Sequence, residues 1–331
     1  MTDSELDLLV VGAGLDGLQR CRRALAAGQH ALLVERLPQP GGAVRTLRSE
    51  GHVCELGPFA LPAAECAARL CGLQRPPTAL APLPAAATGW LWDGRTLHPT
   101  PVDGAPRTFA GGNEDLVTAF RRELGPALWL GRAVTALRPD AAGGWTADLG
   151  GEAPRTLRAR TVALDLPLAA TAGLLAPFEP ALGEVATRLR TAPRGLVFLG
   201  MRQDERADAA LRGYGVLAAT DLPADAEPAR ELLFCTNVFE RRARPGTALV
   251  RVELAGDRVD AADPDALAGL AECELRRITG YDGAIAFRRA HGRPEPVRDG
   301  AWTECRVRVQ ALAERLGIDR CSAASSDPEG G

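Results

Sequence analysis

The chain of 331 residues contains no lysine, so all 39 of its basic side chains are arginine. Aromatic residues make up only 5% of the sequence, and a core must therefore be built mainly from leucine, valine and alanine. The 42 acidic residues leave a net charge of −3, which gives no support for a nucleic-acid partner. The length suffices for one large domain or two ordinary ones.

The sequence also lacks long apolar runs. No segment approaches 18 uninterrupted apolar residues, so we expect no transmembrane helix. The first residues lack the basic region and apolar stretch of a secretory signal. Eight scattered cysteines show no metal-site spacing, which predicts free thiols in a reducing cytoplasm and no metal. Peripheral membrane contact and the oligomeric state are left open.

The stretch from residue 7 to residue 46 is the most informative part of the chain. It reads as a strand, a glycine turn, a helix and a second strand, over residues 8–11, 12–17, 18–27 and 31–34. The first strand is a short apolar run of the kind that is buried in a parallel sheet. The turn has the pattern G-x-G-x-x-G, which in this context predicts a dinucleotide-binding unit.

Each residue of this unit has a mechanical role. Gly12 allows the sharp turn, Gly14 lets the backbone approach a pyrophosphate, and Gly17 lets the helix pack closely on the strand. The helix N-terminus, which includes Leu15, offers unpaired N–H groups to phosphates. Glu35, 23 residues after Gly12, can accept hydrogen bonds from ribose hydroxyl groups.

A second glycine pair indicates which dinucleotide is bound. Residues 41–46, GGAVRT, resemble the G-G-x-x-R-T segment of the FAD-dependent amine oxidase and protoporphyrinogen oxidase superfamily. In that family the arginine lies against the FAD phosphates, a role that suits a guanidinium group. Residues 55–58, ELGP, resemble the segment that brings backbone near the flavin ring. The resemblance implies FAD as cofactor, with contacts from Arg36, Gly42, Arg45 and Gly57.

Later segments extend the resemblance in order along the chain. Residues 90–99 read as a hairpin, and residues 109–117 resemble the segment that starts a returning helix, here expected over 113–124. Val134 occupies the strand position whose backbone contacts the adenine in the family. Residues 162–167 resemble the family's V-V-x-A-x-P, although Asp165 replaces a small residue. Residues 239–246 resemble a loop of protoporphyrinogen oxidases.

These observations predict an α/β fold with a Rossmann-like FAD-binding domain of the GR2 type and a smaller mixed β-sheet substrate domain. The FAD-binding domain is expected to comprise residues 1–61 and 106–167, with 300–318 returning to it. The substrate-type domain would comprise residues 62–105 and 168–299, and residues 319–331 are expected to be disordered.

The chain also departs from the family. Only residues 101–108 stand where the family has a long helical insertion that builds the substrate cavity. The last helix is expected to end near Leu316, and the remaining tail reads as lacking a strand and the family's closing flavin motif. Asp16 places a carboxylate in the phosphate turn; Arg20, Arg22 and Arg23 of the following helix are expected to form a solvated face rather than to offset it.

The resemblance implies an FAD-dependent oxidoreductase similar to protoporphyrinogen oxidase, oxidising a porphyrinogen-like small molecule in porphyrin biosynthesis by hydride transfer to the flavin. One alternative is a non-catalytic, degenerate homologue that acts as an interaction partner; another is an FAD-linked amine oxidase or desaturase. No catalytic side chain is predicted, because the redox step belongs to the cofactor. His30, His52 and His98 are expected to be ordinary packing or surface residues, and Arg95 a solvated hairpin tip.

Overall fold

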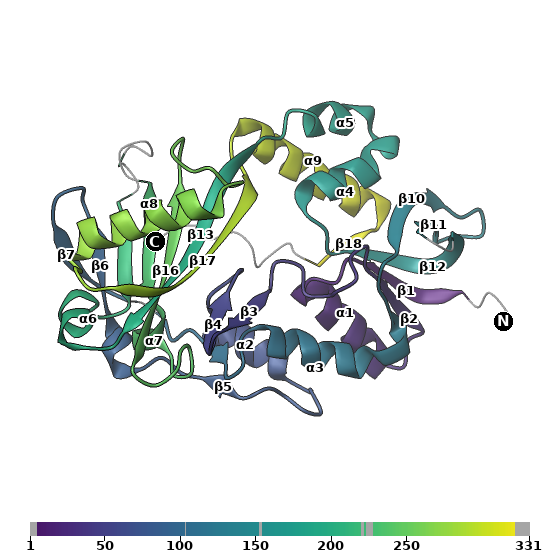
Figure 1. Ribbon diagram of the computed structural model, residues 1–331. Coiled ribbons are helices and arrows are strands. Elements are labelled where there is room, and N and C mark those ends of the chain that lie inside the picture. The colour runs from purple at the N-terminus through teal and green to yellow at the C-terminus, as the bar shows by residue number, and fades with distance from the viewer. Residues whose placement is uncertain (1–4, 103, 152–153, 220–221, 223–227, 322–331) are drawn as a thin grey trace.

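The structure, a computed structural model, describes residues 5–102, 104–151, 154–219, 222 and 228–321. Two large sheets lie side by side, with helices packed on their outer faces (Figure 1). The N-terminal part of the chain builds the centre of one sheet, and the second half of the chain builds most of the other.

The first sheet has the strand order β10-β11-β12-β1-β2-β9, and β18 adds to the carboxyl end of β12. β1 runs parallel to both β2 and β12, and Val11 is in register with Val34 and Leu164. The carboxyl ends of these three strands therefore meet at one edge. The bounds are β1 Leu6–Val11, β2 Ala31–Val34, β9 Leu128–Trp129, β10 Ala133–Pro139, β11 Trp145–Gly150, β12 Arg155–Leu164 and β18 Asp319–Arg320.

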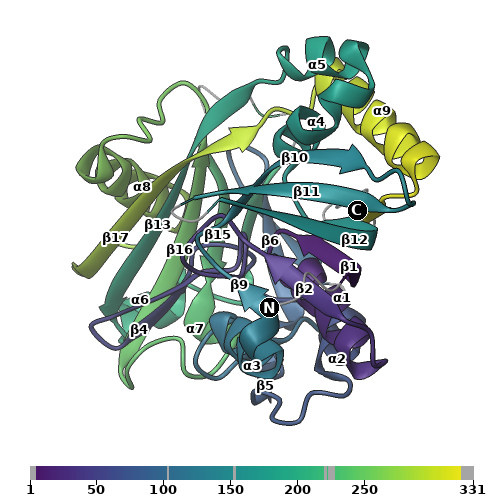
Figure 2. The same ribbon diagram turned by 90° about the vertical axis from the view of Figure 1, so that its right-hand side faces the viewer.

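Helices cover both faces of the first sheet. Leu8 and Val10 of β1 point to one face and share a core with α1, α2 and α3, whereas Leu9 and Val11 point to the other and share a core with α4, α5 and α9. Figure 2 shows α4, α5 and α9 together on the second face. The bounds are α1 Leu15–Ala26, α2 Ala63–Leu70, α3 Glu114–Leu124, α4 Leu168–Leu175, α5 Pro180–Ala186 and α9 Gly300–Leu316.

The helices α4 and α5 lie in residues 168–299, which the sequence assigns to a substrate-type domain. They nevertheless pack in the core of the first sheet, through Ala172, Leu175, Leu182 and Val185. The predicted domain boundaries remain a prediction.

The second sheet has the order β17-β13-β16-β15-β14-β6-β7 and is antiparallel except where β14 meets β6. One face packs against α8, and the other packs on the hairpin of β3 and β4 through a cluster that includes Phe59, Phe198 and Phe239. The bounds are β6 Thr88–Trp92, β7 Leu97–Pro101, β13 Thr191–Arg202, β14 Gly215–Ala218, β15 Ala229–Phe234, β16 Thr247–Ala255, β17 Ile285–Pro296 and α8 Pro264–Thr279.

Small elements complete the described chain. β3 and β4 form a tight hairpin whose turn holds Glu50 and Gly51 at positive φ, as such turns require. A short pair, β5 and β8, links the segment after α2 to the start of α3. The bounds are β3 Thr46–Ser49, β4 His52–Glu55, β5 Ala79–Leu80, β8 Thr108–Phe109, α6 Glu205–Ala210, α7 Cys235–Val238, and the 3-10 helices η1 Pro84–Ala87, η2 Gly125–Ala127 and η3 Ala176–Phe178.

The end of the chain differs from the sequence prediction. Asp319 and Arg320 form β18, which pairs in parallel with Ala163 and Leu164, and Ile318 is buried. The prediction that no strand follows the last helix is therefore wrong, and so is the prediction of disorder for residues 319–321. The rest of the predicted disordered segment, residues 322–331, lies outside the described residues.

Candidate functional site

The first glycine turn connects β1 to α1 at the edge where three parallel strands end. Gly12 has φ +101°, and a Cβ atom there would lie 2.0 Å from the carbonyl oxygen of Asp165. A Cβ atom on Gly17 would lie 2.3 Å from the carbonyl oxygen of Gly12. Since real contacts are never this short, both positions require glycine, for the reasons that the dinucleotide-binding pattern gives.

The N-terminus of α1 points an unsatisfied backbone donor at this turn. Gly14 is the N-cap residue and has no side chain to cap the helix. The N–H group of Leu15 has no acceptor among the described residues, while its side chain packs on the core below. The positive end of the helix dipole is therefore available to an anion.

Glu35 closes the turn from the end of β2. Its Oε2 accepts a hydrogen bond from the N–H of Ala13 at 2.8 Å, and its Oε1 accepts one from the N–H of Leu37 at 2.8 Å. The carboxylate thus faces the phosphate turn, and each oxygen keeps a further lone pair for a hydroxyl donor. Arg36, the next residue, is exposed to solvent.

The second glycine segment packs directly on the first. The N–H of Gly41 donates to the carbonyl of Ala13 at 2.6 Å, and a Cβ on Gly42 would lie 3.1 Å from Cα of Gly14. Gly57 approaches from the β4 side, where a Cβ would lie 2.0 Å from the carbonyl oxygen of Ala43. The structure therefore brings these glycines into one layer of closely packed backbone.

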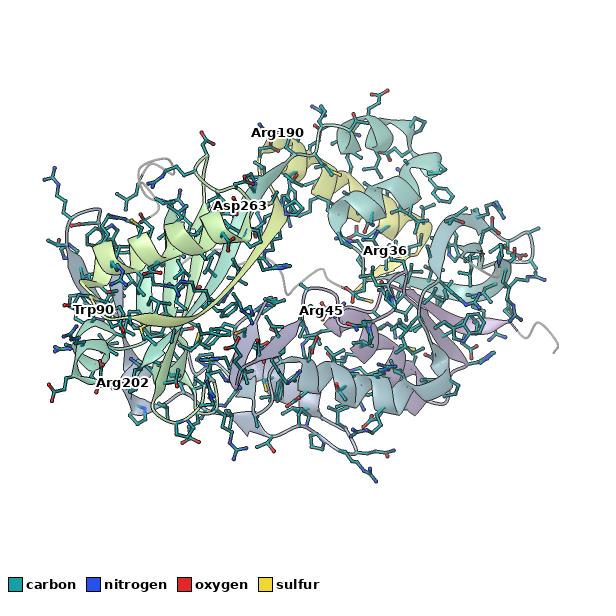
Figure 3. The ribbon with its side chains drawn as sticks, viewed as in Figure 1. Arg36, Arg45, Trp90, Arg190, Arg202 and Asp263 are labelled. Carbon is teal, nitrogen blue, oxygen red and sulfur yellow. The ribbon has the colours of Figure 1, made fainter. Side chains whose placement is uncertain are left out.

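The guanidinium group of Arg45 donates hydrogen bonds to carbonyl groups of the loop that precedes it. Its Nη1 donates to the carbonyl of Pro40 at 2.6 Å and to that of Val44 at 3.1 Å, and Nη2 donates to Gln39 at 3.3 Å. In Figure 3 the labels of Arg36 and Arg45 both fall in the region between the two sheets. The arginine holds the shape of the second glycine loop, and its contact with phosphates remains a prediction.

Val134 lies in β10, beyond the segment that pairs with the end of β2. The N–H of Arg132 donates to the carbonyl of Glu35 at 2.9 Å, and Val134 packs on the core that includes Val34. Val134 thus follows, by two residues along the chain, a direct contact with Glu35. An adenine contact at Val134 remains a prediction.

Asp16 forms an ion pair with Arg69, which the sequence alone does not predict. Arg69 of α2, only 3% exposed, donates from Nη2 to Asp16 at 2.8 Å and to Glu65 at 2.6 Å. Arg20 pairs with Asp319, and Arg22 donates to the carbonyls of Cys71 and Gly72. These two arginines thus bind specific groups instead of forming only a solvated face. Sequence spacing cannot anticipate the contact between α1 and α2, because it depends on how the helices pack.

The residue that sequence reasoning treated only as a departure, Asp165, lies directly against the phosphate turn. Its Oδ2 accepts a hydrogen bond from the N–H of Gly17 at 2.7 Å. Burial, with smaller contributions from the charges of Asp16 and Glu35, raises the pKa of Asp165 to about 6, against the bond from Gly17 and the charge of Arg69.

A buried polar junction joins the glycine motifs to the second sheet. Glu55 accepts hydrogen bonds from Thr46 Oγ1 at 2.8 Å and from the N–H of Asn113 at 2.9 Å, and its Oε1 lies 3.2 Å from Nη1 of Arg242. Arg242 is fully buried and also donates to the carbonyl of Phe109 at 2.6 Å. The junction thus brings into contact the three segments that carry sequence motifs, residues 55–58, 109–117 and 239–246.

Comparisons with known proteins agree with this architecture. The profile of the NAD(P)-binding Rossmann-like domain family matches residues 10–71. A protein proposed to be a protoporphyrinogen oxidase from Exiguobacterium sp. 255-15 superposes with a TM-score of 0.73, at 15% identity, over 96% of this chain and 93% of that one. Putrescine oxidase shares the same fold, with a TM-score of 0.65 at 11% identity for one of its mutants.

Solved structures that share this fold carry the names of different enzymes. A reduced UDP-galactopyranose mutase has a TM-score of 0.72 at 10% identity, over 96% of this chain and 88% of that one. Wild-type putrescine oxidase bound to putrescine has a TM-score of 0.64 at 11% identity, over 87% and 84%. At these identities the similarity shows the fold alone.

Two curated sequence relatives of the chain are hydroxyneurosporene desaturases. The Rhodobacter capsulatus enzyme is 35% identical over 136 residues, which are 38% of this chain and 27% of the enzyme. The Cereibacter sphaeroides enzyme is 36% identical over 123 residues, 35% of this chain and 24% of the enzyme. The match thus spans about a quarter of the length of these curated relatives.

The remaining candidate side chains lie away from the glycine segments. His98 is exposed and pairs with Asp93 at 2.7 Å, His30 is exposed, and Arg95 is exposed at the tip of the β6–β7 hairpin. In the described ranges no three His, Cys, Asp or Glu side chains are grouped so as to hold a metal ion. None of the described helices has the length and apolar character to cross a bilayer.

Proposed function

We propose that the chain binds FAD in the cradle formed by the two glycine segments and is an FAD-dependent oxidoreductase similar to protoporphyrinogen oxidase. The observation that carries the proposal is the contact between the segments: Gly41 binds Ala13, Gly42 lies on Gly14, and Glu35 closes the same turn. The glycines leave a backbone surface without side chains, which is what close approach of a pyrophosphate requires.

The residues of this cradle fit the adenosine diphosphate half of the cofactor. The N–H of Leu15 and the positive end of α1 would bind a phosphate oxygen, and Glu35 would accept hydrogen bonds from ribose hydroxyl groups. Arg45 and Gly42 would border the phosphates, and the backbones of Val134 and Gly57 would border the adenine and the flavin. When bound, FAD supplies the redox chemistry as a hydride acceptor.

Three classes of substrate are candidates under this proposal. A porphyrinogen-like molecule is the first candidate, by the likeness of residues 239–246 to protoporphyrinogen oxidases. Arg242 of that loop is buried in the junction with Glu55, so packing already accounts for part of the likeness. A desaturase is the second candidate, because the curated relatives are hydroxyneurosporene desaturases. An amine substrate is the third, since putrescine oxidase shares the fold.

A non-catalytic homologue is a further candidate, because the carboxylate of Asp165 lies against the phosphate turn. The leading proposal includes participation in porphyrin biosynthesis and a cytoplasmic location. Both depend on demonstrated turnover of a porphyrinogen-like substrate.

The first experiment measures flavin binding. The purified protein is incubated with FAD, passed through gel filtration and examined by its visible spectrum, and the dissociation constant is measured from quenching of flavin fluorescence. We expect retained flavin bands. Glu35→Ala should raise the dissociation constant by about tenfold or more, the effect of losing hydrogen bonds to a charged group, and Glu35→Gln by less.

The control is Glu114→Ala, which removes an acid of α3 that pairs with the half-exposed Arg48. It should leave flavin affinity unchanged. A colourless protein that takes up no FAD at any pH would contradict the proposal and favour the non-catalytic homologue. With flavin bound, turnover of porphyrinogens, amines and polyenes then separates the three substrate candidates.

A further inference from the structure

Asp165 stands where a dinucleotide cradle is normally open. Its carboxylate Oδ2 would lie 2.5 Å from a Cβ on Gly14 and 2.9 Å from a Cβ on Gly17. The space that the missing side chain of Gly14 leaves for a pyrophosphate is thus partly filled by the carboxylate of the residue that follows β12. The same oxygen accepts the hydrogen bond of Gly17, one of the first N–H groups of α1.

The backbone of Asp165 is fixed. Its N–H donates to the carbonyl of Val11 at 2.8 Å, and its own carbonyl lies against Gly12. A cofactor therefore cannot displace the residue as a whole. Only rotation of the side chain or loss of its charge can relieve a conflict with a phosphate.

The charges around this carboxylate do not neutralise it. Arg69 already binds Asp16 and Glu65, and Arg20 pairs with Asp319 at 2.9 Å. The charged or titratable groups that act on Asp165 are Asp16 of α1, Glu35 at the end of β2, Arg69 of α2 and Cys321 after β18, and Arg20 and Asp319 lie beside Cys321. Arg69 and Arg20 have acidic partners, and Arg45 of the neighbouring glycine loop donates to main-chain carbonyls. The carboxylate of Asp165 therefore adds to the negative charge that an incoming diphosphate meets.

We propose that Asp165 makes cofactor binding proton-coupled: the carboxylate competes with the pyrophosphate for the N-terminal end of α1, and the site takes up one proton from solvent at Asp165 when the cofactor binds. The inference rests on the proposed function and deepens it. Because burial already raises the pKa of Asp165 to about 6, the neutral form is accessible near neutral pH. A bound diphosphate stabilises that neutral form further, so affinity falls as pH rises.

The alternative is that Asp165 serves only to hold β12 to α1 through its bond to Gly17. Asp165→Asn separates the two roles, because an amide oxygen still accepts the Gly17 N–H but carries no charge. Asp165→Ser, which is smaller and also neutral, provides a second variant if the amide disturbs folding. Thermal unfolding followed by circular dichroism checks that each variant is folded.

The test is a titration of FAD, and separately of ADP and adenosine, between pH 5.5 and 8.5. For the unsubstituted protein the dissociation constants of FAD and ADP should rise by up to about tenfold per pH unit above the pKa, as uptake of one proton requires. In Asp165→Asn the dissociation constants of FAD and ADP should be nearly independent of pH. At pH 8 they should be about ten- to a hundredfold lower than those of the unsubstituted protein. Adenosine, which lacks phosphates, should show no pH dependence in either protein.

Glu114→Gln is the control, because it removes an acid of α3 that pairs with Arg48 and is not among the groups that act on Asp165. It should keep the pH dependence of the unsubstituted protein. Equal pH profiles for the unsubstituted protein and Asp165→Asn would overturn this inference while leaving flavin binding intact. If neither protein bound FAD or ADP at any pH, the proposed function would fail and this inference with it.

Discussion

At the scale of single residues, the burial of His52 is expected to reduce the stability of the fold at low pH. Its imidazole is 2% exposed, stacks on Phe287 with ring centroids 4.0 Å apart, and its Nε2 has no hydrogen-bond partner among the described residues. Burial is the main cause that lowers the pKa of His52, and the charges of Arg244 and Arg289 add to it, against the bond to Ser49.

A lowered pKa in the folded state implies acid sensitivity. The unfolded chain takes up a proton near pH 6.5, whereas the folded chain does so only at lower pH, so the contribution of His52 to stability is present above pH 6.5 and lost as pH falls. We expect the free energy of unfolding in urea to decrease between pH 7 and pH 5 by about 1 kcal/mol more than in His52→Leu.

The control for this measurement is His291→Leu, which removes an exposed histidine of β17. It should follow the unsubstituted protein at every pH. A His52→Leu variant with the same acid sensitivity as the unsubstituted protein would show that the histidine is protonated in the fold.

Residue-level reasoning from the sequence predicted the glycine turn and the acid at its edge but not the charges around them, and contact of these residues with a cofactor remains a prediction. The spacing of Gly12, Gly14 and Gly17 and the acid at Glu35 could be read directly, because each role is local to one turn or one strand end. Arg69 could not be found, since its contact with Asp16 joins helices 53 residues apart in sequence. Asp165 could be marked as unusual, but only the register of β12 with β1 places its carboxylate on the turn.

At the scale of elements, the junction of Glu55 and Arg242 connects the β3–β4 hairpin to the segments before α3 and after α7. Both charged groups are at most 1% exposed, and burial raises the pKa of Glu55 and lowers that of Arg242. A buried ion pair adds little over an apolar pair of equal volume, but removing one partner leaves an uncompensated charge.

We therefore expect Arg242→Met to reduce the free energy of unfolding by about 3–5 kcal/mol, measured by urea denaturation. The double variant Arg242→Met with Glu55→Leu should lose less than the sum of the two single variants, because no buried charge remains. The matched control is Arg241→Met, the exposed neighbour, which should change stability by less than about 0.5 kcal/mol. Additive losses in the double variant would contradict the coupling.

Elements with strong local signals could be predicted, and those fixed by pairing could not. The helix α8 has clear local signals at both ends, because Asp263 caps its start and Gly280, at φ +71°, ends it. The strand β17 instead takes its length from a partner, since it continues to Pro296 beside β13, which begins at Thr191. The strand β18 was missed because two residues carry no periodic pattern.

At the scale of the whole molecule, the reactivity of the eight cysteine thiols depends on how the chain is packed. All eight are free; Cys71 and Cys273 are exposed, Cys321 is half-buried, and the other five are buried. Burial raises the pKa of Cys21 and Cys235 to about 12 each, which leaves almost no thiolate at neutral pH.

Titration with a disulfide reagent at pH 8 should therefore show two fast thiols, one slower thiol and five that react only after unfolding in urea. The double variant Cys71→Ser with Cys273→Ser should lose the fast phase and keep the rest. Five or more fast thiols in the native protein would mean that the described cores are not closed.

The two-sheet architecture was predictable from the order of motifs along the chain, but the way the sheets are joined was not. Local patterns predict a hairpin at residues 90–99 without predicting that its first strand, β6, pairs in parallel with β14, more than a hundred residues later. The fold depends on such long-range pairing, which has no signature in a short window of sequence.

The position of β18 has a practical consequence for anyone who labels this protein. The N–H of Cys321 donates to the carbonyl of Leu164 at 3.0 Å, next to the phosphate turn, and its thiol is free and half-buried. A dye or spin label attached to this thiol would therefore lie beside the proposed flavin cradle and alter its measured affinity. For this reason the exposed Cys71 or Cys273 is the better position for a label in every titration described above.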